Sequence, residues 1–524
     1  FQHTDFIDKE QKGSYDLKNT NTFSYDINVI LSYFKTFNKH LLNAGFVYNL
    51  RETQYDMSGM YVLGFPNANM DHVSIGAGFQ EGSRPSGSFD VTRLVGFVGN
   101  LSYTFDNRFL FDASVRGDGS SLYGSHKRWG TFWSVGIGYN LHNEKFMKRQ
   151  SVINLLKLRA SIGTTGGQNF NPYQSMAMYS YNDSRLDGIS YSGYIGAILK
   201  AFGNKNLRWQ KVEKRNIGLD FELFRSRLTG SFNLYQDISK DVLVDVSLAP
   251  SLGFSSYKEN LGEVKNSGIE LSLKGTLVND VKRGIKWDVL FNLAHNKNEV
   301  MKINQALTAF NDKQDADVKN KPMVRYQEGL SQNTIWVNES LGIDPATGEE
   351  IFLDRKGNKV NVWDARNYKP WGSTDPKVYG TFGTMLVVGN WEFNAHFYYK
   401  CGGYLYNQTL VDKVENVNPN ENGDRRILYD RWSKPGDVAK FKKVSDVSVT
   451  NPTSRFVEKE NQLQLQSLSL SYDFRGKHLQ NWGIQRLKLS AIGNDIFTSS
   501  TVRMERGTVY PYARTFSLAA QLTF

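Results

Sequence analysis

The 524-residue sequence predicts an all-β protein whose fold is an antiparallel transmembrane β-barrel. Three observations favour this class: long segments that alternate apolar and polar residues, connections that are alternately short and long, and a 13% aromatic content in a polar chain of mean hydropathy −0.47. Disordered chains are poor in aromatic residues. The longest apolar run, 193–199, is far shorter than the ~20 residues of a spanning helix.

Period-two alternation predicts the strands. In 391–399 (WEFNAHFYY) apolar residues at odd positions alternate with mostly polar ones, and 217–223 and 516–524 repeat the pattern. Strands of soluble sheets are typically ~5–6 residues long, whereas a tilted strand needs ~9–11 residues to cross a membrane. We therefore expect about fifteen spanning strands. They lie near 22–36, 39–53, 91–105, 107–118, 128–141, 153–165, 207–224, 226–240, 259–277, 284–298, 376–388, 390–403, 460–476, 482–497 and 512–524.

The connections between these strands alternate in length, as they do in bacterial outer-membrane barrels with short periplasmic turns and long extracellular loops. Short turns are expected at Asp106 and at Arg225, for example. Within 460–476 the apolar residues change parity near Gln466, which predicts a β-bulge. We expect long outer loops near 54–90, 166–206, 299–375 and 404–459.

The strand number predicts an incomplete barrel. Fifteen is odd, whereas single-chain bacterial barrels have even strand numbers. We therefore expect residues 1–21 to be the end of an extracellular loop and 22–524 to be the C-terminal portion of one barrel domain. The first residue, Phe1, and the lack of an apolar leader near the start agree with a processed chain or a fragment.

Aromatic residues gather near the expected periplasmic strand ends, which predicts an interfacial girdle. The alternative is the core of a large soluble β-sandwich. The girdle candidates are Phe105, Phe109, Tyr139, Phe224, Trp287, Trp391, Phe474, Trp482 and Phe524.

Several sequence blocks resemble the SusC/RagA-type TonB-dependent outer-membrane transporters. Segment 109–139 resembles the strand–DGSS turn–strand hairpin of that family. Segments 154–169, 206–220 and 261–270 resemble its later blocks, and 510–524 resembles its last strand. Each block is weak evidence alone, but their order and spacing match over most of the chain.

The resemblance implies a 22-stranded barrel with an N-terminal plug, closed on the outside by a SusD-like surface lipoprotein. On this implication the remaining strands, the plug, the TonB-contacting segment and the export signal lie upstream of Phe1. It further implies TonB-dependent import of oligomeric nutrients, oligosaccharide or peptide, across the bacterial cell outer membrane. The sequence favours neither substrate class over the other.

The last strand is a candidate assembly signal. An alternating strand that ends in an aromatic residue is a free edge until the barrel closes, and the barrel-assembly machinery can bind it by strand addition. The alternative is a merely hydrophobic strand. The residues concerned are Phe516, Leu518, Leu522 and Phe524.

Aromatic residues in the expected outer loops are candidates for facing substrate or a partner, because exposed rings stack on sugars or pack on peptides. The alternative is that they pack the long loops together. The candidates are Trp336, Trp363, Tyr368, Trp371, Tyr404, Tyr406 and Trp432.

No residue pattern predicts catalysis, a cofactor or a metal. The sequence lacks H-E-x-x-H, G-x-S-x-G and P-loop motifs, and the single Cys401 excludes a multi-cysteine site. The 118–121 DGSS run has one carboxylate, so we expect a hairpin tip, with Gly117 and Gly119 allowing the turn.

The net charge of +11 is scattered, which argues against nucleic-acid binding. In a membrane barrel, rim Lys and Arg residues would instead face lipid or lipopolysaccharide head groups. Two other functions stay open. One is a passive outer-membrane channel or adhesin barrel, which would lack a plug upstream. The other is a secreted β-sandwich carbohydrate-active enzyme, which would carry a pair of acidic residues.

Overall fold

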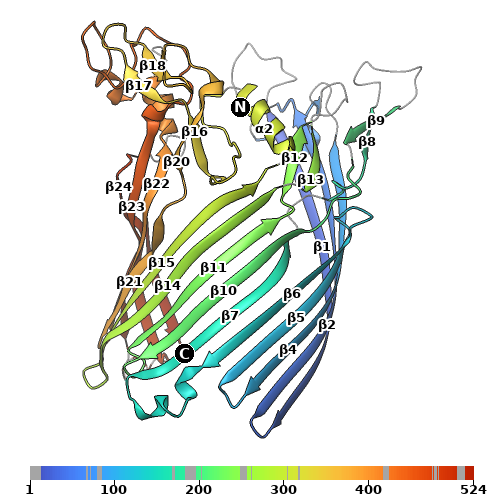
Figure 1. Ribbon diagram of the computed structural model, residues 1–524, viewed down its shortest axis with the longest axis vertical. Coiled ribbons are helices and arrows are strands. Elements are labelled where there is room, and N and C mark those ends of the chain that lie inside the picture. Colours follow the sequence, from blue (N-terminus) through green and yellow to red (C-terminus); the bar gives the residue numbers. More distant parts are fainter. Residues whose placement is uncertain are drawn as a thin grey trace.

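The computed structural model is dominated by one antiparallel sheet of 16 strands that curls into a wall of tilted strands (Figure 1). The order across the sheet follows the chain, and each spanning strand pairs with its neighbours in sequence. The structure describes residues 13–66, 69–70, 72–79, 85–167, 172–182, 196–201, 203–247, 256–260, 262–303, 305–316, 319–416, 424–474, 476, 479, 481, 483–503 and 514–524.

Fifteen strands form the continuous path of the described sheet, as predicted, and short β3 (Gly78–Phe79) adds to β2. The path runs through β1 (Ser14–Phe37), β2 (His40–Leu63), β4 (Ser86–Phe105), β5 (Phe109–Ser120), β6 (Trp129–Asn140), β7 (Ile153–Gly167), β10 (Gln210–Leu223), β11 (Leu228–Lys240), β14 (Glu263–Asp280), β15 (Ile285–Lys302), β21 (Val378–Val388), β22 (Trp391–Tyr406), β23 (Val457–Phe474), β24 (Arg486–Ser500) and β25 (Thr515–Thr523).

The first hairpin is longer than predicted. β1 begins at Ser14 rather than near residue 22, and its pairing with β2 continues up to Leu63. Residues 14–21 are thus strand rather than the end of a loop. The segment 18–22 (KNTNT) is polar on both faces, so it carries no alternation from which a strand could be predicted.

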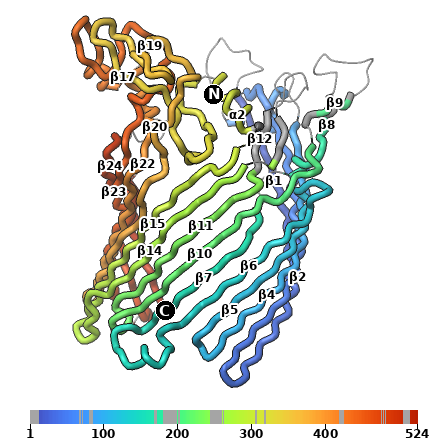
Figure 2. The backbone as a smooth tube through the Cα atoms, viewed as in Figure 1, coloured from blue at the N-terminus to red at the C-terminus, as the bar shows by residue number. Residues whose placement is uncertain are grey.

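Most connections follow the predicted alternation, with short turns at one end of the sheet and long loops at the other (Figure 2). The connection 121–128 at the loop end is an exception, since it is shorter than 141–152 at the turn end. The turns between β1 and β2 and between β21 and β22 each have two residues, and Asn38 (φ 52°) and Gly389 (φ 59°) adopt the left-handed conformation. Such turns match the right-handed twist of the strands they join.

The two faces of the sheet differ as predicted. Asp26 lies opposite Arg51 and forms an ion pair with it on the inner face, whereas the next residue, Ile27, lies opposite Leu50 on the outer face. The predicted bulge is also confirmed: β23 skips Gln466 in its register with both β22 and β24. The bulge restores the apolar outer face, because the strand changes parity there.

The described girdle candidates lie at the turn end of the strands. Phe109 stacks between Phe105 and Tyr139, with ring centroids 6.5 and 4.9 Å away. Tyr472 contacts both Trp391 and Phe474, with centroid distances of 4.7 and 4.5 Å. Phe224, Trp287 and Phe524 are exposed at the same end, and Trp482 lies outside the described residues.

The prediction of a hairpin tip at 118–121 is wrong. β5 continues to Ser120, and the connection to β6 covers 121–128. Asp118 is an inner-face strand residue paired with Arg116 at 2.6 Å. Gly119 lies beneath the Trp129 indole, which a Cβ atom at this position would meet at 3.0 Å. A larger residue there would displace the exposed indole, so this glycine serves close packing rather than a turn.

Two small hairpins stand on the loop side of the sheet: β8 (Met178–Asn182) with β9 (Gly196–Ala201), and β12 (Leu243–Ser247) with β13 (Ser256–Asn260). Among the helices in the described part of the chain, none has the length and apolarity to cross a membrane. The buried apolar clusters lie mainly at the loop end, where they support the elements described next.

Candidate functional site

Two long connections fold together above β21–β23 (Figure 1). We call the described residues of 303–377 and 407–456 the cap. Its first connection forms a helix and two small sheets, and its second forms short helical turns. The cap contains α2 (Gln305–Ala316), β16 (Thr334–Val337), β17 (Ser340–Ile343), β18 (Glu350–Leu353), β19 (Lys359–Val360), η6 (Ala365–Asn367), β20 (Lys369–Ser373), α3 (Gln408–Leu410), η7 (Val411–Glu415), η8 (Arg425–Leu428) and η9 (Ser454–Phe456).

The cap has its own apolar core, as long ordered loops require. One cluster contains Val411, Val414, Phe441 and Phe456. A second contains Trp336, Ala365 and Tyr368. Burial raises the pKa of the Tyr368 hydroxyl, which therefore stays neutral at physiological pH.

Backbone hydrogen bonds join the two connections of the cap. The Asn338 amide donates to the Pro452 carbonyl at 3.1 Å, and the Ser454 amide donates to the Asn338 carbonyl at 2.9 Å. The Trp363 indole N–H also donates to the Pro452 carbonyl, at 3.1 Å. Asn338 is fully buried, so these bonds are shielded from water and fix the two loops to each other.

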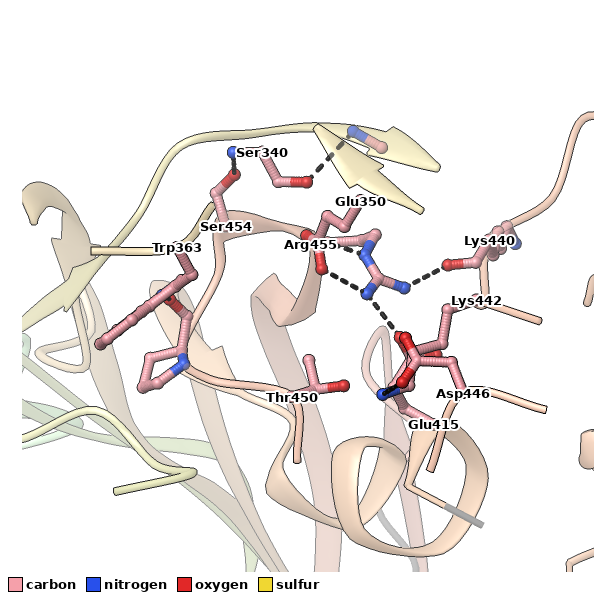
Figure 3. A network of polar contacts seen from close by, with 12 residues as sticks. Ser340, Glu350, Trp363, Glu415, Lys440, Lys442, Asp446, Thr450, Ser454 and Arg455 are labelled. Carbon is pink, nitrogen blue, oxygen red and sulfur yellow. Dashed lines mark hydrogen bonds and ion pairs between the residues drawn. The ribbon is translucent and has the colours of Figure 1, made fainter. Parts of the chain in front are cut away.

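A buried ion-pair cluster lies at the centre of the cap (Figure 3). The Arg455 guanidinium contacts the carboxylates of Glu350 at 2.8 Å and Glu415 at 2.6 Å, and it donates to the Lys440 carbonyl. The three charged side chains are 11%, 9% and 0% exposed. Burial alone would lower the pKa of Arg455, but the two carboxylates raise it overall. The cluster thus links β18, η7 and η9 through one charge.

A cavity of about 480 Å³ lies where β15 separates from β21. The two strands pair up to Ala294 and Tyr379, and the loop-side part of β15 then borders the cavity. Residues 295–298 form one wall, and 370–377 together with Tyr404 form the other. We call this cavity the mouth pocket.

Asp375 organises the mouth pocket. Its carboxylate accepts hydrogen bonds from the Asn333 amide at 2.7 Å and from the Ser373 hydroxyl at 2.9 Å, and it accepts a further bond from the Ser331 hydroxyl. On the opposite wall, the Asn298 side-chain oxygen accepts from the Gln332 backbone amide at 2.9 Å. Lys297, Lys377, Leu330, Pro370 and Pro376 also line the pocket. It therefore combines apolar surface with amides, hydroxyls and charged groups of both signs, which suits an oligomer that has both apolar and hydrogen-bonding groups.

The seven aromatic candidates of the outer loops differ in their surroundings. Trp336 and Tyr368 are buried in the cap core, and Trp363 packs on Tyr368. Tyr406 packs against the Phe456 cluster. Trp432 donates its indole N–H to the Pro345 carbonyl at 2.9 Å. Trp371 is exposed, and Tyr404 lines the mouth pocket.

The polar residues of the mouth pocket carry no signal in the sequence. Asn298, Ser331 and Asp375 come from three separate segments and belong to no motif. These residues lie close together because β15 and β21 stop pairing beyond Ala294 and Tyr379. Where the two strands separate depends on the loop between them. Within the described residues, no group of three or more His, Cys, Asp or Glu side chains could hold a metal ion.

The candidate assembly residues lie on the outward face of β25. Phe516, Leu518, Leu522 and Phe524 are 73%, 90%, 47% and 76% exposed. Among the described residues, β25 pairs with β24 alone, so its other edge is open.

These features define a class: a bacterial outer-membrane β-barrel whose strands carry an ordered cap of surface loops. Residues 2–413 match the family model described as "TonB dependent receptor-like, beta-barrel". The chain belongs to this family, which is one of receptors and transporters located in the outer membrane.

Relatives specify the branch of the family. TonB-dependent receptor P39 of Formosa agariphila is 26% identical over 92% of this chain and 49% of its own length. TonB-dependent receptor SusC of Bacteroides thetaiotaomicron is 30% identical over 61% of this chain and 32% of its own length. The solved RagAB peptide transporter superposes with a TM-score of 0.85 at 23% identity, over 98% of this chain and 56% of that chain. The resemblance to SusC/RagA-type proteins is confirmed, and this chain spans about half the length of P39.

Proposed function

We propose that this chain forms the wall and surface loops of a TonB-dependent importer of oligomeric nutrients, either glycan or peptide. The mouth pocket is the single observation that carries this proposal, since it presents amides, hydroxyls and charged side chains of both signs beside the ordered cap. Sugar hydroxyls and peptide amides both fit such a lining. Family membership supports the transport class, and the RagAB relative is described as a peptide transporter.

We further propose that the barrel is completed by strands outside this chain, as the C-terminal portion of one barrel domain would require. Within the described residues, β1 and β25 are the two edges of the sheet. Unpaired backbone groups are costly in lipid, so these edges need partner strands. The plug and the TonB-contacting segment would come from the same additional part.

We propose two protein partners from the resemblance to SusC/RagA-type transporters. A SusD-like surface lipoprotein would cover the cap, where Trp371 is exposed. The barrel-assembly machinery would bind the open edge of β25 by strand addition before closure. In this role the outward-facing side chains of β25 are the assembly signal.

The proposed function is tested by uptake into cells that carry the full-length protein. Fluorescent oligosaccharides and peptides are supplied to these cells, to cells in which the gene is deleted, and to cells treated with a protonophore. We expect accumulation of one of the two classes, abolished by deletion and by the protonophore. Uptake that resists the protonophore would instead indicate a passive channel.

Replacing Asp375 with Ala is expected to lower uptake of the transported oligomer by at least tenfold. The change removes the acceptor shared by Ser331, Asn333 and Ser373. Hydrogen bonds to charged groups contribute about 1.5–3 kcal/mol each. Uptake is measured at equal protein level in the outer membrane.

The matched control for Asp375 is Asp354→Ala in the same cap. Asp354 accepts hydrogen bonds from Lys356 and Asn358 in the turn between β18 and β19, and it does not line the mouth pocket. Uptake by this variant should match that of the unmodified protein. Equal losses in the two variants would show that the cap responds nonspecifically and that the pocket has no particular role.

A further inference from the structure

A groove of about 550 Å³ lies on the outward face of the wall between β6 and β11. Four outward-facing side chains form one row across neighbouring strands, and this row gives the groove its shape. Ile137 lies opposite Ala160, Ala160 lies opposite Ile217, and Ile217 lies opposite Leu234. Ala160 is the smallest side chain of this row, so its position forms the floor between the larger neighbours. Around this row the groove is lined mainly by aliphatic side chains.

The loop-side end of the groove is polar. The next row of outward-facing residues lies two positions closer to the loop end of each strand. It contains Val135, Ile162, Arg215 and Gln236. Arg215 and Gln236 both line the groove. The outward surface therefore changes from aliphatic to cationic within one step along β10 and β11.

A belt of charges continues from Arg215 along the outward face. Glu213 contacts Arg215 at 2.6 Å and Lys240 at 3.4 Å. The side chains of Arg215 and Lys240 remain 53% and 50% exposed, so one carboxylate neutralises only part of their charge.

The same arrangement recurs two strands further along. Glu299 contacts Lys265 at 2.8 Å and Lys297 at 3.6 Å, and the Lys297 side chain is 65% exposed. The register places Arg215 opposite Gln236, Gln236 opposite Ser267, and Ser267 opposite Lys297. Lys211 and Glu263 lie on either side of Lys240 in the same outward row. Five cations and three carboxylates thus lie along β10, β11, β14 and β15, which leaves an excess positive charge spread over ~14 Å at the usual strand spacing.

The depth of the belt follows from the strand length. Between Arg215 and the turn after Leu223, the outward residues Ile217, Leu219 and Phe221 are all apolar. That stretch matches the ~9–11 residues with which a tilted strand crosses the bilayer. Since the aromatic girdle marks the turn end, Arg215 lies at head-group level in the leaflet next to the long loops.

We propose that the groove binds one acyl chain of an outer-leaflet phosphoglycolipid, with the phosphates of its head group held by Arg215, Lys240 and Lys297. The Arg215 guanidinium donates from Nε and Nη2 to Glu213 Oε1 at 3.0 and 2.6 Å. Its other edge, formed by Nη1 and the second N–H of Nη2, can bind a phosphate with two hydrogen bonds. The spread of the belt suits a head group with two phosphates rather than one. This site serves the surrounding membrane. Lys297 also lines the mouth pocket, whereas Arg215 does not, so the test is made at Arg215.

The test uses the full-length protein in detergent micelles, and the bound lipid is counted by native mass spectrometry. The probes are bisphosphorylated lipid A and the same lipid after enzymatic removal of its phosphates. We expect the phosphorylated form to bind at least tenfold more tightly. Arg215→Gln should abolish this preference while the barrel stays folded, as checked by heat-modifiable migration on gels.

A second pair of variants tests the apolar part of the groove. Ala160→Leu fills the floor and should weaken binding of both lipid forms. Ala44→Leu is the matched control, because Ala44 lies opposite Leu101 in the outward row of β2, outside the groove. Equal binding of the two lipid forms, or retained preference in Arg215→Gln, would overturn the proposal and leave only ordinary annular lipid. Equal effects of the two alanine substitutions would overturn the role of the groove.

Discussion

Replacing Arg455 with Leu is expected to destabilise the cap by about 3–5 kcal/mol, because the change leaves the carboxylates of Glu350 and Glu415 buried without a countercharge. The wall of the barrel should be unaffected, since its strands are held by their own ladders. The measurement is hydrogen exchange of the Asn338 amide, which bonds across the two connections of the cap. Its protection should fall while the amides of β22 stay protected.

Two further variants separate charge burial from loss of packing. The triple variant Arg455→Leu, Glu350→Gln, Glu415→Gln removes the uncompensated charges and should recover much of the lost stability. Arg366→Leu breaks a pair with Asp364 in which Arg366 is 85% exposed, and such surface pairs contribute about 0–1 kcal/mol. If Arg455→Leu costs no more than Arg366→Leu, the buried cluster does not hold the cap together.

An Arg at position 518 is expected to destabilise the folded barrel by about 2–4 kcal/mol, and an Arg at position 522 by only about 0–1 kcal/mol. Leu518 and Leu522 share the outward face of β25, but Leu522 lies near the girdle whereas Leu518 lies closer to the middle of the apolar band. The cost of a charge in lipid rises with depth, which sets the order of the two effects. Denaturant unfolding of the full-length protein in lipid vesicles gives both free energies.

The neighbouring Ala519 provides the control for this gradient. Ala519 lies opposite Ser490 on the inner face, so Ala519→Arg places the same charge on the same strand but away from lipid. We expect a loss well below that of Leu518→Arg. Similar losses at 518 and 519, or no difference between 518 and 522, would mean that this face of β25 does not contact the hydrocarbon region.

The membrane wall was predictable because one physical constraint acts on every residue of it. Lipid on one side and water on the other impose a period of two over the whole spanning length, so strands such as 391–403 are evident from alternation. The bulge at Gln466 could also be predicted. The apolar residues change there from odd to even positions, and an extra residue is needed to keep them on one face. Where water contacts both faces of a strand, as in 14–21, no alternation of apolar and polar residues is imposed. That part of the strand therefore could not be predicted.

The candidate site was much less predictable, because its contacts join residues far apart in the chain. Five of the seven predicted loop aromatics lie in the cap, whereas Tyr404 and Tyr406 belong to the loop end of β22. Alternation says nothing about which of these side chains pack inward. Trp336 and Tyr368 became core residues, whereas Tyr404 faces the mouth pocket. Arg455 and Glu350 are separated by 105 residues, and no local pattern marks them as partners.

The interlocked loops of the cap impose an order on folding. The Ser340 amide donates to the Ser454 hydroxyl across 114 residues, and between these two positions the chain passes through β21 and β22. Closing so long a loop is slow unless its ends are first brought together. The pairing of Val378 with Cys401 does this, because it sets the stems of both connections side by side. We therefore expect the cap to form late in folding, so that an antibody against its assembled surface would report completed insertion of this hairpin.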